Sequence, residues 1–353
     1  MKKILIILGL IYQCLFGFVN SNANFEKEIE ILRNLDIDPS FASNDVFLSM
    51  KENIKENQIR DYINVLKKGY AFIPTLQKII EEEKIPESFL YLAMAESNFS
   101  PKASSRVRAG GLWQFMPRTA RKMGLRINRH IDERFDPIKS TKAATAYLKF
   151  LYNRFKKWYL VAIAYNCGEG KLSRALKRAG TDDLKTLLDP DKKYIPKESR
   201  RYIKKILLMA HIANDTDLIV KNDATFLLNR SKTDYLKTIS IKGGTTLKSV
   251  AKKCKISYKE LRFYNAHIKR GYIPRSLKKC NIYIPYQQYI AFRQNPSPLV
   301  QYKRNRHIKY RIKKGDTLGL LARKFNTKIT KIKLANNMKT AFLRTGKSIV
   351  IPR

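Results

Sequence analysis

Two segments in the last third of the chain resemble each other, and this internal repeat limits what the sequence can fold into. Residues 244–247 align with residues 315–318 at an offset of 71 residues, and at the same offset Asn265 meets Asn336. Each copy begins with a short β-like run and ends with another that a proline closes. In the second copy, apolar residues between these runs recur at helical spacing in two places. Each copy is therefore predicted to form a strand–helix–helix–strand unit.

The remainder of the chain has helical patterning, so the predicted fold class is multidomain, with a mainly α domain and two small α+β modules. A length of 353 residues favours two or three domains. No run after the N-terminus is long and apolar enough to span a membrane. The expected organisation, in chain order, is an export signal at 1–23, an N-terminal helical region at 24–69, a helical domain at 70–215, a first module at 238–286, a linker at 287–307 and a second module at 308–353.

The N-terminus has the pattern of a secretory signal. Lys2 and Lys3 precede an apolar run over residues 4–19, and small residues follow up to Ala23. The run is shorter than the roughly 20 residues of a spanning helix, which favours export over an uncleaved anchor. A lipid-modified Cys14 is a third interpretation, but the preceding Gln is not the small residue that such a signal requires.

The charge is strongly positive, with 71 Lys and Arg against 29 Asp and Glu, or +42. Such a charge predicts polyanionic partners, and export makes the cell wall and lipid headgroups better candidates than nucleic acid. A generally lysine-rich proteome is an equally good explanation of the charge. The four His are far apart and no CxxC occurs, so neither a metal site nor a cofactor is expected.

Glu96 is the candidate catalytic residue. Phe89, Leu92, Ala93 and Glu96 follow the i, i+3, i+4, i+7 spacing, which puts the carboxyl on the apolar face of a helix. Burial there would raise its pKa and keep a proton available near neutral pH, as a general acid requires. A glutamate that faces solvent from the last helical turn is the alternative interpretation of this feature alone.

The spacing of further motifs decides between these interpretations. Ser105 lies nine residues after Glu96, and Gln114 and Met116 lie 18 and 20 residues after it. A segment with Tyr165 and Asn166 follows, and then Tyr-Ile-Pro-Lys-Glu-Ser-Arg-Arg-Tyr over residues 194–202. Together these motifs resemble the family 1 lytic transglycosylases, whose catalytic fold is related to goose-type lysozyme. The two repeated units resemble LysM, a small module that binds N-acetylglucosamine-containing glycans, and the match is stronger for the second.

The resemblance implies an enzyme that cleaves the MurNAc–GlcNAc β-1,4 bond of peptidoglycan without water and leaves a 1,6-anhydro-MurNAc end. It implies that Glu96 protonates the leaving oxygen and then takes the proton of the C6 hydroxyl. Ser105 would bind the substrate near its N-acetyl group. The other substrate-binding residues would be Gln114, Met116, Tyr165, Asn166 and Glu198. The expected partner is peptidoglycan, and the expected location is the periplasm, with membrane association as a further option.

Two other functions remain open. A muramidase would hydrolyse the same bond and needs a second carboxylate to activate water, for which Asp136 and Glu198 are the candidates. A non-catalytic wall-binding protein would retain the modules with an inactive site. The chain also departs from the family pattern at Arg108, which stands where glycine is usual, so a differently shaped turn is expected there. Cys254 and Cys280 either form a disulfide, or Cys254 is a core residue of the first module, since it aligns with Phe325 of the second.

Overall fold

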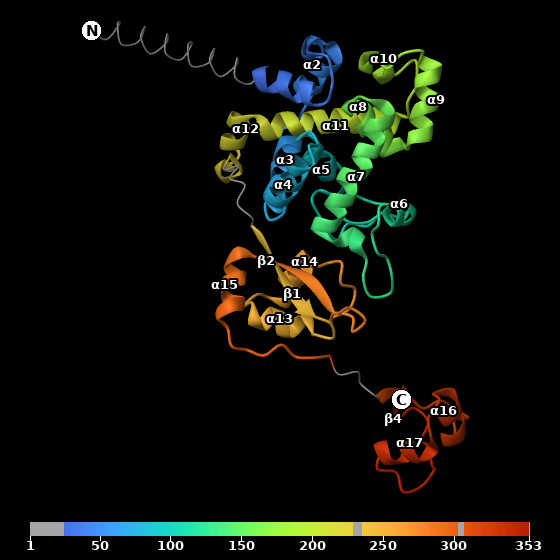
Figure 1. Ribbon diagram of the computed structural model, residues 1–353. Coiled ribbons are helices and arrows are strands. Elements are labelled where there is room, and N and C mark those ends of the chain that lie inside the picture. The colour runs from blue at the N-terminus through green and yellow to red at the C-terminus, as the bar shows by residue number, and fades with distance from the viewer. Residues whose placement is uncertain (1–24, 229–234, 303–306, 353) are drawn as a thin grey trace. The chain divides into compact units, whose positions relative to one another are not determined.

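The structure is a computed structural model that describes residues 25–228, 235–302 and 307–352. These residues form two compact units, one ending at Val300 and the other following it. The first unit contains the helical domain and the first module, and the second unit contains the second module (Figure 1). The expected export signal lies outside the described residues. Within them, no helix has the length and apolar character needed to cross a membrane.

The helical domain begins with a helix over residues 25–34. Short 3-10 helices interrupt the α-helices at three places, namely η1 (Pro39–Ser43), η2 (Glu133–Phe135) and η3 (Thr225–Leu228). The α-helices that follow are α2 (Asp45–Glu52), α3 (Glu56–Gly69), α4 (Ile73–Glu82), α5 (Phe89–Ser97), α6 (Pro117–Lys122), α7 (Pro137–Phe155), α8 (Trp158–Cys167), α9 (Glu169–Ala179), α10 (Leu184–Leu188), α11 (Lys197–Asn214) and α12 (Thr216–Lys221).

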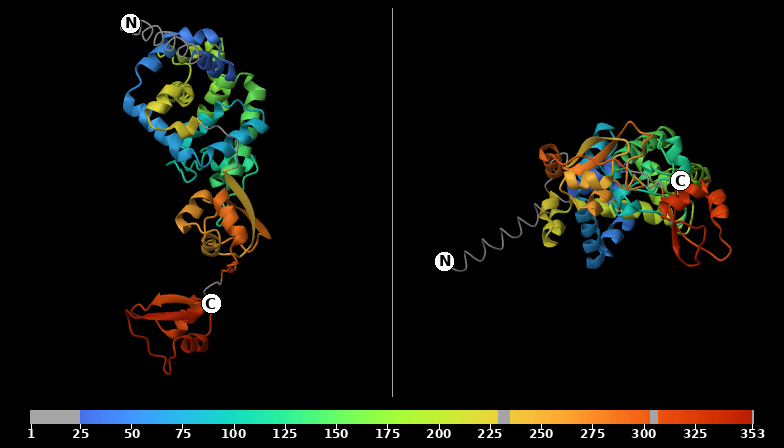
Figure 2. Two further views of the ribbon diagram at one scale, coloured as in Figure 1. Left: turned by 90° about the vertical axis from the view of Figure 1, so that its left-hand side faces the viewer. Right: turned by 90° about the horizontal axis from the view of Figure 1, so that it is seen from below.

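Two helices lie at the centre of this domain. Helix α8 is apolar along nearly its whole length, and it packs against α7, α9 and α11. Helix α11 also contacts α2, α3 and α5, so it holds the N-terminal helices against the rest of the domain. The left view of Figure 2 shows α11 (yellow) with the N-terminal helices (blue) arching around it. The buried faces of these helices bring the C-terminal end of α5 next to α11.

Local sequence signals fix the ends of the helices that carry the site. Helix α5 ends at Ser97 because Asn98 takes the left-handed conformation, with φ 50°. Helix α7 begins at Pro137, whose fixed φ suits a first helical position, and the Asp136 carboxylate caps its backbone N–H groups. Helix α8 ends at Cys167, because the next residue, Gly168, has φ 87°, a conformation that favours glycine.

Both modules have the predicted strand–helix–helix–strand order, which confirms the expected fold class. The first contains β1 (Leu236–Lys242), α13 (Leu247–Lys253), α14 (Tyr258–Tyr264) and β2 (Lys279–Pro285). The second contains β3 (His307–Arg311), α16 (Leu318–Lys324), α17 (Ile329–Ala335) and β4 (Ser348–Pro352). In each module the two strands pair antiparallel.

The asparagine that recurs at the repeat offset makes the same contacts in both modules. Asn265 donates to Tyr283 O at 2.7 Å and accepts from Tyr283 N at 2.8 Å. Asn336 donates to Val350 O at 2.6 Å and accepts from Val350 N at 2.7 Å. The amide thus ties the end of the second helix to the last strand, using both of its polar groups.

The structure differs from the expected linker at 287–307. Helix α15 (Tyr286–Gln294) occupies its first part, and apolar side chains of residues 289–299 pack on the core of the first module. Residues 295–298, which contain two prolines and a serine, follow the end of α15, and Lys253 Nζ donates to Asn295 O at 2.5 Å. The three cysteines among the described residues are free, and Cys254 is buried in the core of this module.

Candidate active site

Glu96 lies in the last turn of α5 and is half-buried. The hydroxyl of Tyr202, on α11, donates a hydrogen bond of 2.7 Å to Glu96 Oε1. Because α5 packs against α11, one side of a carboxyl at the end of α5 meets α11. The geometry gives one carboxyl group a fixed orientation inside a partly apolar site.

Burial raises the pKa of the Glu96 carboxyl. The hydrogen bond from Tyr202 and the positive charge of Lys205 act in the opposite direction, and the negative charge of Glu198 adds to the rise. Desolvation is the largest of these effects, so the pKa remains above its ordinary value. The site therefore stabilises the protonated acid relative to a carboxyl exposed to water.

Tyr202 and Lys205 contact this region, and the sequence analysis assigned no role to either. Lys205 Nζ donates to Ala95 O at 3.2 Å, and burial lowers the pKa of this ammonium. Burial also raises the pKa of Tyr202 well above its ordinary value, with a further contribution from the negative charge of Glu96. The sequence did contain a signal for Tyr202 and Lys205. They follow Glu198 at spacings of four and three residues, so all three share one face of α11.

Tyr165 lies on α8 close to the same carboxyl. Its hydroxyl donates to Trp113 O at 2.7 Å, and its ring centroid lies 5.6 Å from that of Tyr147. Burial raises the pKa of Tyr165 well above its ordinary value, and the charge of Glu96 raises it further. Tyr165 of α8 and Tyr202 of α11 thus both act on the candidate acid. Tyr147 of α7, which the sequence analysis did not single out, packs on the Tyr165 ring.

Residues 103–116 carry three of the predicted substrate-binding residues, and on that prediction they are here called the substrate loop. Ser105 Oγ accepts a hydrogen bond of 3.0 Å from Ala109 N. Gln114 has φ 44°, and its Nε2 donates to Gly111 O at 2.8 Å and to Ala103 O at 3.2 Å. The amide nitrogen of Gln114 therefore holds the loop together. Met116, at the end of the loop, is 44% exposed.

The two remaining predicted residues lie at the contact between α8 and α11. Asn166 Oδ1 accepts a hydrogen bond of 2.6 Å from Ser199 Oγ, which joins the two helices. Glu198 is exposed at the start of α11. Its charge acts on Glu96, but no hydrogen bond between these two carboxyl groups is present in the described residues.

Asp136, one candidate for a second catalytic carboxylate, is buried in a different environment. Its Oδ1 accepts from the backbone N–H groups of Ile138 and Lys139, and its Oδ2 accepts from the Tyr283 hydroxyl at 3.1 Å. Its relative exposure is 2%, so it is closed off from bulk water. Asp136 therefore has a structural role at the start of α7 and is not positioned to activate a water molecule.

Arg108 has φ 69°, the left-handed conformation that glycine adopts readily. The turn therefore keeps a backbone suited to glycine, although an arginine occupies it. Among the described residues, no group of three or more His, Cys, Asp or Glu could hold a metal ion.

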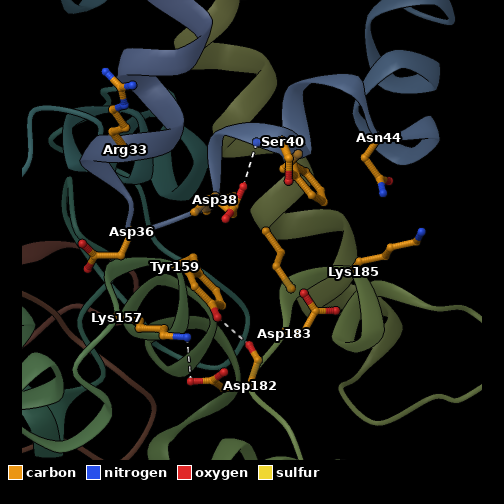
Figure 3. Close-up of a pocket in the computed structure, with 13 residues that line it drawn as sticks. Arg33, Asp36, Asp38, Ser40, Asn44, Lys157, Tyr159, Asp182, Asp183 and Lys185 are labelled. Atoms are coloured by element: carbon orange, nitrogen blue, oxygen red, sulfur yellow. Dashed lines mark hydrogen bonds and ion pairs between the residues drawn. The ribbon is translucent and has the colours of Figure 1, made fainter.

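A pocket of about 620 Å³ lies elsewhere on the helical domain, between the N-terminal helices and α8 and α10 (Figure 3). Its aspartates are engaged in local contacts: Asp182 pairs with Lys157 at 2.8 Å, and Asp38 accepts from Ser40 N. None of the predicted site residues lines this pocket. The size of a pocket therefore does not identify the candidate active site of this protein.

Family models match three parts of the chain. Residues 75–188 match the transglycosylase SLT domain, residues 235–300 match the LysM-like domain of lytic transglycosylase MltD, and residues 310–352 match the LysM domain. The first of these includes Glu96 and the substrate loop, and the second includes α15 as part of the first module.

Individual proteins that match the chain are described as lytic transglycosylases. The chain is 26% identical over 290 residues to membrane-bound lytic murein transglycosylase D of Escherichia coli, covering 77% of this chain and 61% of that protein. It is 29% identical over 163 residues to membrane-bound lytic murein transglycosylase C of Yersinia pestis, covering 40% of this chain and 46% of that protein. A solved structure, the 70 kDa soluble lytic transglycosylase of Escherichia coli, matches with a TM-score of 0.34 and 24% identity over 42% of this chain and 24% of that one.

The matched domains define a transglycosylase SLT domain followed along the chain by two LysM-type modules. The chain spans about 61% of the length of the first curated relative. It is homologous to the membrane-bound lytic murein transglycosylase D of Escherichia coli.

Proposed function

We propose that the chain is a peptidoglycan lytic transglycosylase that cleaves the MurNAc–GlcNAc β-1,4 bond and leaves a 1,6-anhydro-MurNAc end. The observation that carries the proposal is the half-buried Glu96 carboxyl, held by Tyr202 and with its pKa raised by burial. A single carboxyl group that alternates between acid and base is sufficient for this reaction. The homology to lytic murein transglycosylases supports the same substrate.

In the first step Glu96 donates its proton to the glycosidic oxygen, and the bond from C1 to that oxygen breaks. The Glu96 carboxylate, stabilised by the Tyr202 hydroxyl and the Lys205 charge, then accepts the proton of the C6 hydroxyl. The C6 oxygen forms a new bond to C1, so no water is consumed. Glu96 ends the cycle protonated, and the substrate's N-acetyl group stabilises the developing charge at C1.

The other predicted residues surround this carboxyl in the proposal. Ser105, Gln114 and Met116 contribute to the site through the substrate loop, and Tyr165 contributes from α8, where its hydroxyl donates to Trp113 O of that loop. Asn166 and Glu198 support the geometry where α8 meets α11, because Asn166 is bonded to Ser199 at the start of α11. Glu198 also tunes the acid through its charge.

Hydrolysis of the same bond is the competing function, and the environment of Asp136 argues against it. With Asp136 buried and bonded to Tyr283, Glu198 is the remaining candidate to activate water. The test is mass spectrometry of the products released from purified peptidoglycan sacculi by the full chain. Anhydro products, lighter by one water than the hydrolysed ones, support the proposal, whereas reducing ends would show a muramidase.

The variant Glu96→Gln tests the role of the Glu96 carboxyl in the reaction. We expect turnover to fall by at least about a thousandfold, because the amide cannot donate or accept the proton. Glu83→Gln is the control, since Glu83 forms an exposed ion pair with Lys149 at 2.6 Å. Sacculus digestion that persists in Glu96→Gln would rule out this mechanism, and a native protein that binds sacculi without cleaving them would be a wall-binding protein.

We also infer that the second module binds the glycan, and that the enzyme works in the periplasm after export, with membrane association as in the name of its homologue.

The two modules differ in what covers their surface. In the first module, residues 271–273 cover the turn that follows β1. Three backbone bonds of 2.8–2.9 Å fix this cover, from Gly244 N to Ile273 O, Ile273 N to Thr245 O and Leu247 N to Gly271 O. The second module exposes Leu334 and Phe342, at 80% and 70%, and in this proposal their apolar side chains contact the glycan.

A chain that ends at Val300 tests the role of the second module, which is a separate compact unit with its own core. We expect binding to sacculi to weaken about tenfold or more, while cleavage of a short soluble glycan stays unchanged. Phe342→Ser in the full chain should also weaken binding to sacculi. Equal binding by the native and shortened chains would contradict glycan binding by this module.

A further inference from the structure

The first module, here residues 235–300, is packed against the helical domain. The Phe72 ring lies 5.2 Å from the ring of Phe263 and 5.8 Å from that of Tyr264, measured between centroids. Tyr264 and Tyr283 are buried within the hydrophobic core of the helical domain. A module tethered only by a linker would not place aromatic side chains in another domain's core.

The backbone adds a second contact at one edge of the helical domain. Residues 130–132 lie beside residues 267–269 of the first module, with an antiparallel bridge between Ile131 and Ile268. Two backbone hydrogen bonds, of 2.8 Å and 2.9 Å, join these segments. The module therefore holds residues 130–136, here called the bracing segment, through hydrogen bonds as well as apolar contacts.

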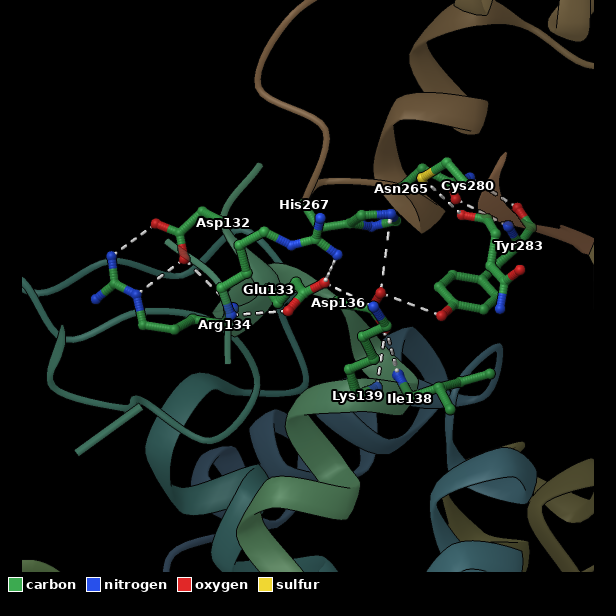
Figure 4. Close-up of polar contacts among 12 residues, drawn as sticks. Asp132, Glu133, Arg134, Asp136, Ile138, Lys139, Asn265, His267, Cys280 and Tyr283 are labelled. Carbon is green, nitrogen blue, oxygen red and sulfur yellow. Dashed lines mark hydrogen bonds and ion pairs between the residues drawn. The ribbon is translucent and has the colours of Figure 1, made fainter. Parts of the chain in front are cut away.

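Asp136 completes this contact at the end of the bracing segment (Figure 4). Its carboxylate caps α7 on one side, and on the other it accepts from the Tyr283 hydroxyl and lies 3.8 Å from His267 Nε2. Tyr283 and His267 both belong to the first module. One buried carboxylate thus links the start of α7 to two side chains of the module.

Arg134 extends from the bracing segment toward the substrate loop. Its guanidinium is held by both oxygens of Asp132, at 3.0 Å and 2.8 Å. Its Nη1 donates to Arg108 O at 2.6 Å and to Phe115 O at 3.1 Å. These two carbonyls lie on opposite arms of the substrate loop, so one buried side chain fixes their separation.

We propose that the first module positions the substrate loop through the bracing segment, with Arg134 as the positioning residue. The chain of contacts runs from residues 267–269 to Asp132, from Asp132 to Arg134, and from Arg134 to the loop that carries Ser105 and Gln114. The inference rests on the proposed function in assigning that loop to substrate binding. The module is then a structural part of the active site as well as a member of a glycan-binding family.

The experiment uses the full chain and two readouts, amide hydrogen exchange of residues 103–116 and the kinetics of glycan cleavage. We expect Arg134→Met to speed exchange in the substrate loop about tenfold and to raise KM about tenfold, with a smaller change in kcat. Arg134→Lys should recover part of both effects, because an ammonium can still donate to one carbonyl. Arg154→Met is the matched control, since Arg154 forms an exposed ion pair with Glu169.

The module side of the contact is tested with Tyr283→Phe, which removes only the hydroxyl bonded to Asp136. We expect faster exchange in both the bracing segment and the substrate loop, although Tyr283 is not part of the loop. If residues 103–116 exchange at the native rate in either variant, Tyr283→Phe or Arg134→Met, the inference is overturned. Because exchange needs no catalysis, a native chain that cleaves nothing would refute the proposed function without affecting this result.

Discussion

The Tyr202 hydroxyl donates a hydrogen bond of 2.7 Å to Glu96 Oε1, joining two residues that lie 106 positions apart in the sequence. The bond stabilises the carboxylate, whereas burial stabilises the protonated acid. Glu96 must take both forms during the proposed reaction. The balance between these two effects therefore sets the pH range of the proposed reaction.

Tyr202→Phe removes the hydrogen bond and leaves the ring in place. Because the bond lowers the pKa of Glu96, its loss raises that pKa further, and the alkaline limb of the pH–rate profile should move to higher pH. We expect kcat near neutral pH to fall about tenfold, since the carboxylate that accepts the C6 proton is less stabilised. An unchanged or acid-shifted alkaline limb would contradict this account.

Glu198→Gln should shift the same limb in the opposite direction. The negative charge of Glu198 raises the pKa of Glu96, so its removal lowers that pKa and the alkaline limb moves to lower pH. Because Glu198 is exposed, the shift should shrink as salt is added. Glu83→Gln is the control, and a profile like that of native protein is expected for it.

Gly111→Ala should destabilise the helical domain strongly. Gly111 has φ 81°, and a Cβ there would lie 1.7 Å from Arg134 O, which belongs to the bracing segment. We expect a loss of at least about 3 kcal/mol in the free energy of unfolding, measured by urea denaturation. Gly124→Ala is the matched control, because Gly124 has φ 80° with no heavy atom within 4 Å of the added Cβ, and about 1 kcal/mol is expected there.

Glu28→Gln should destabilise the helical domain at neutral pH. Glu28 is buried, and its carboxylate lies 2.8 Å from Lys51 Nζ and 3.2 Å from His211 Nδ1. Burial alone would raise the pKa of Glu28, but the hydrogen bonds from His211 and Lys51 outweigh it, so the folded pKa lies below the ordinary 4.5.

The stabilisation from Glu28 is therefore present above about pH 4.5 and is lost as the pH falls through the lowered folded pKa. We expect the variant to lose about 2 kcal/mol at pH 7 and to approach native stability in acid. Thermal unfolding across this pH range measures the difference. A deficit that stayed constant down to low pH would mean that the charge of Glu28 does not stabilise the fold.

Much of the modular architecture could be predicted from the repeat. The aligned Asn265 and Asn336 form equivalent hydrogen bonds to the last strand of their modules, because identical residues at equivalent positions of the repeat meet the same backbone groups. The helical spacing around Glu96 placed its carboxyl on the apolar face, and the structure has it half-buried at the end of α5. Such patterns are local, and the sequence carries them directly.

The roles of Asp136 and Arg134 could not be predicted in this way. Asp136 is a sequence candidate for a second catalytic carboxylate, yet its partners include Tyr283, 147 residues away. Arg134 lies in no recognised motif, and its carbonyl partners belong to a turn 19 to 26 residues earlier. Their partners are set by how the first module packs, and no periodicity reports that.

The sequence by itself determined the order of domains, the strand–helix–helix–strand modules and the glutamate at the end of an apolar helix. These features depend on residues near one another in the chain, whose spacing fixes which face is buried. Only the tertiary structure decided that Tyr202 and Lys205 shift the pKa of Glu96 and that Asp136 is buried away from water. It also decided that the first module contacts the bracing segment, which holds the substrate loop. Hydrogen bonds and desolvation act over a few ångströms in space, whatever the distance along the chain.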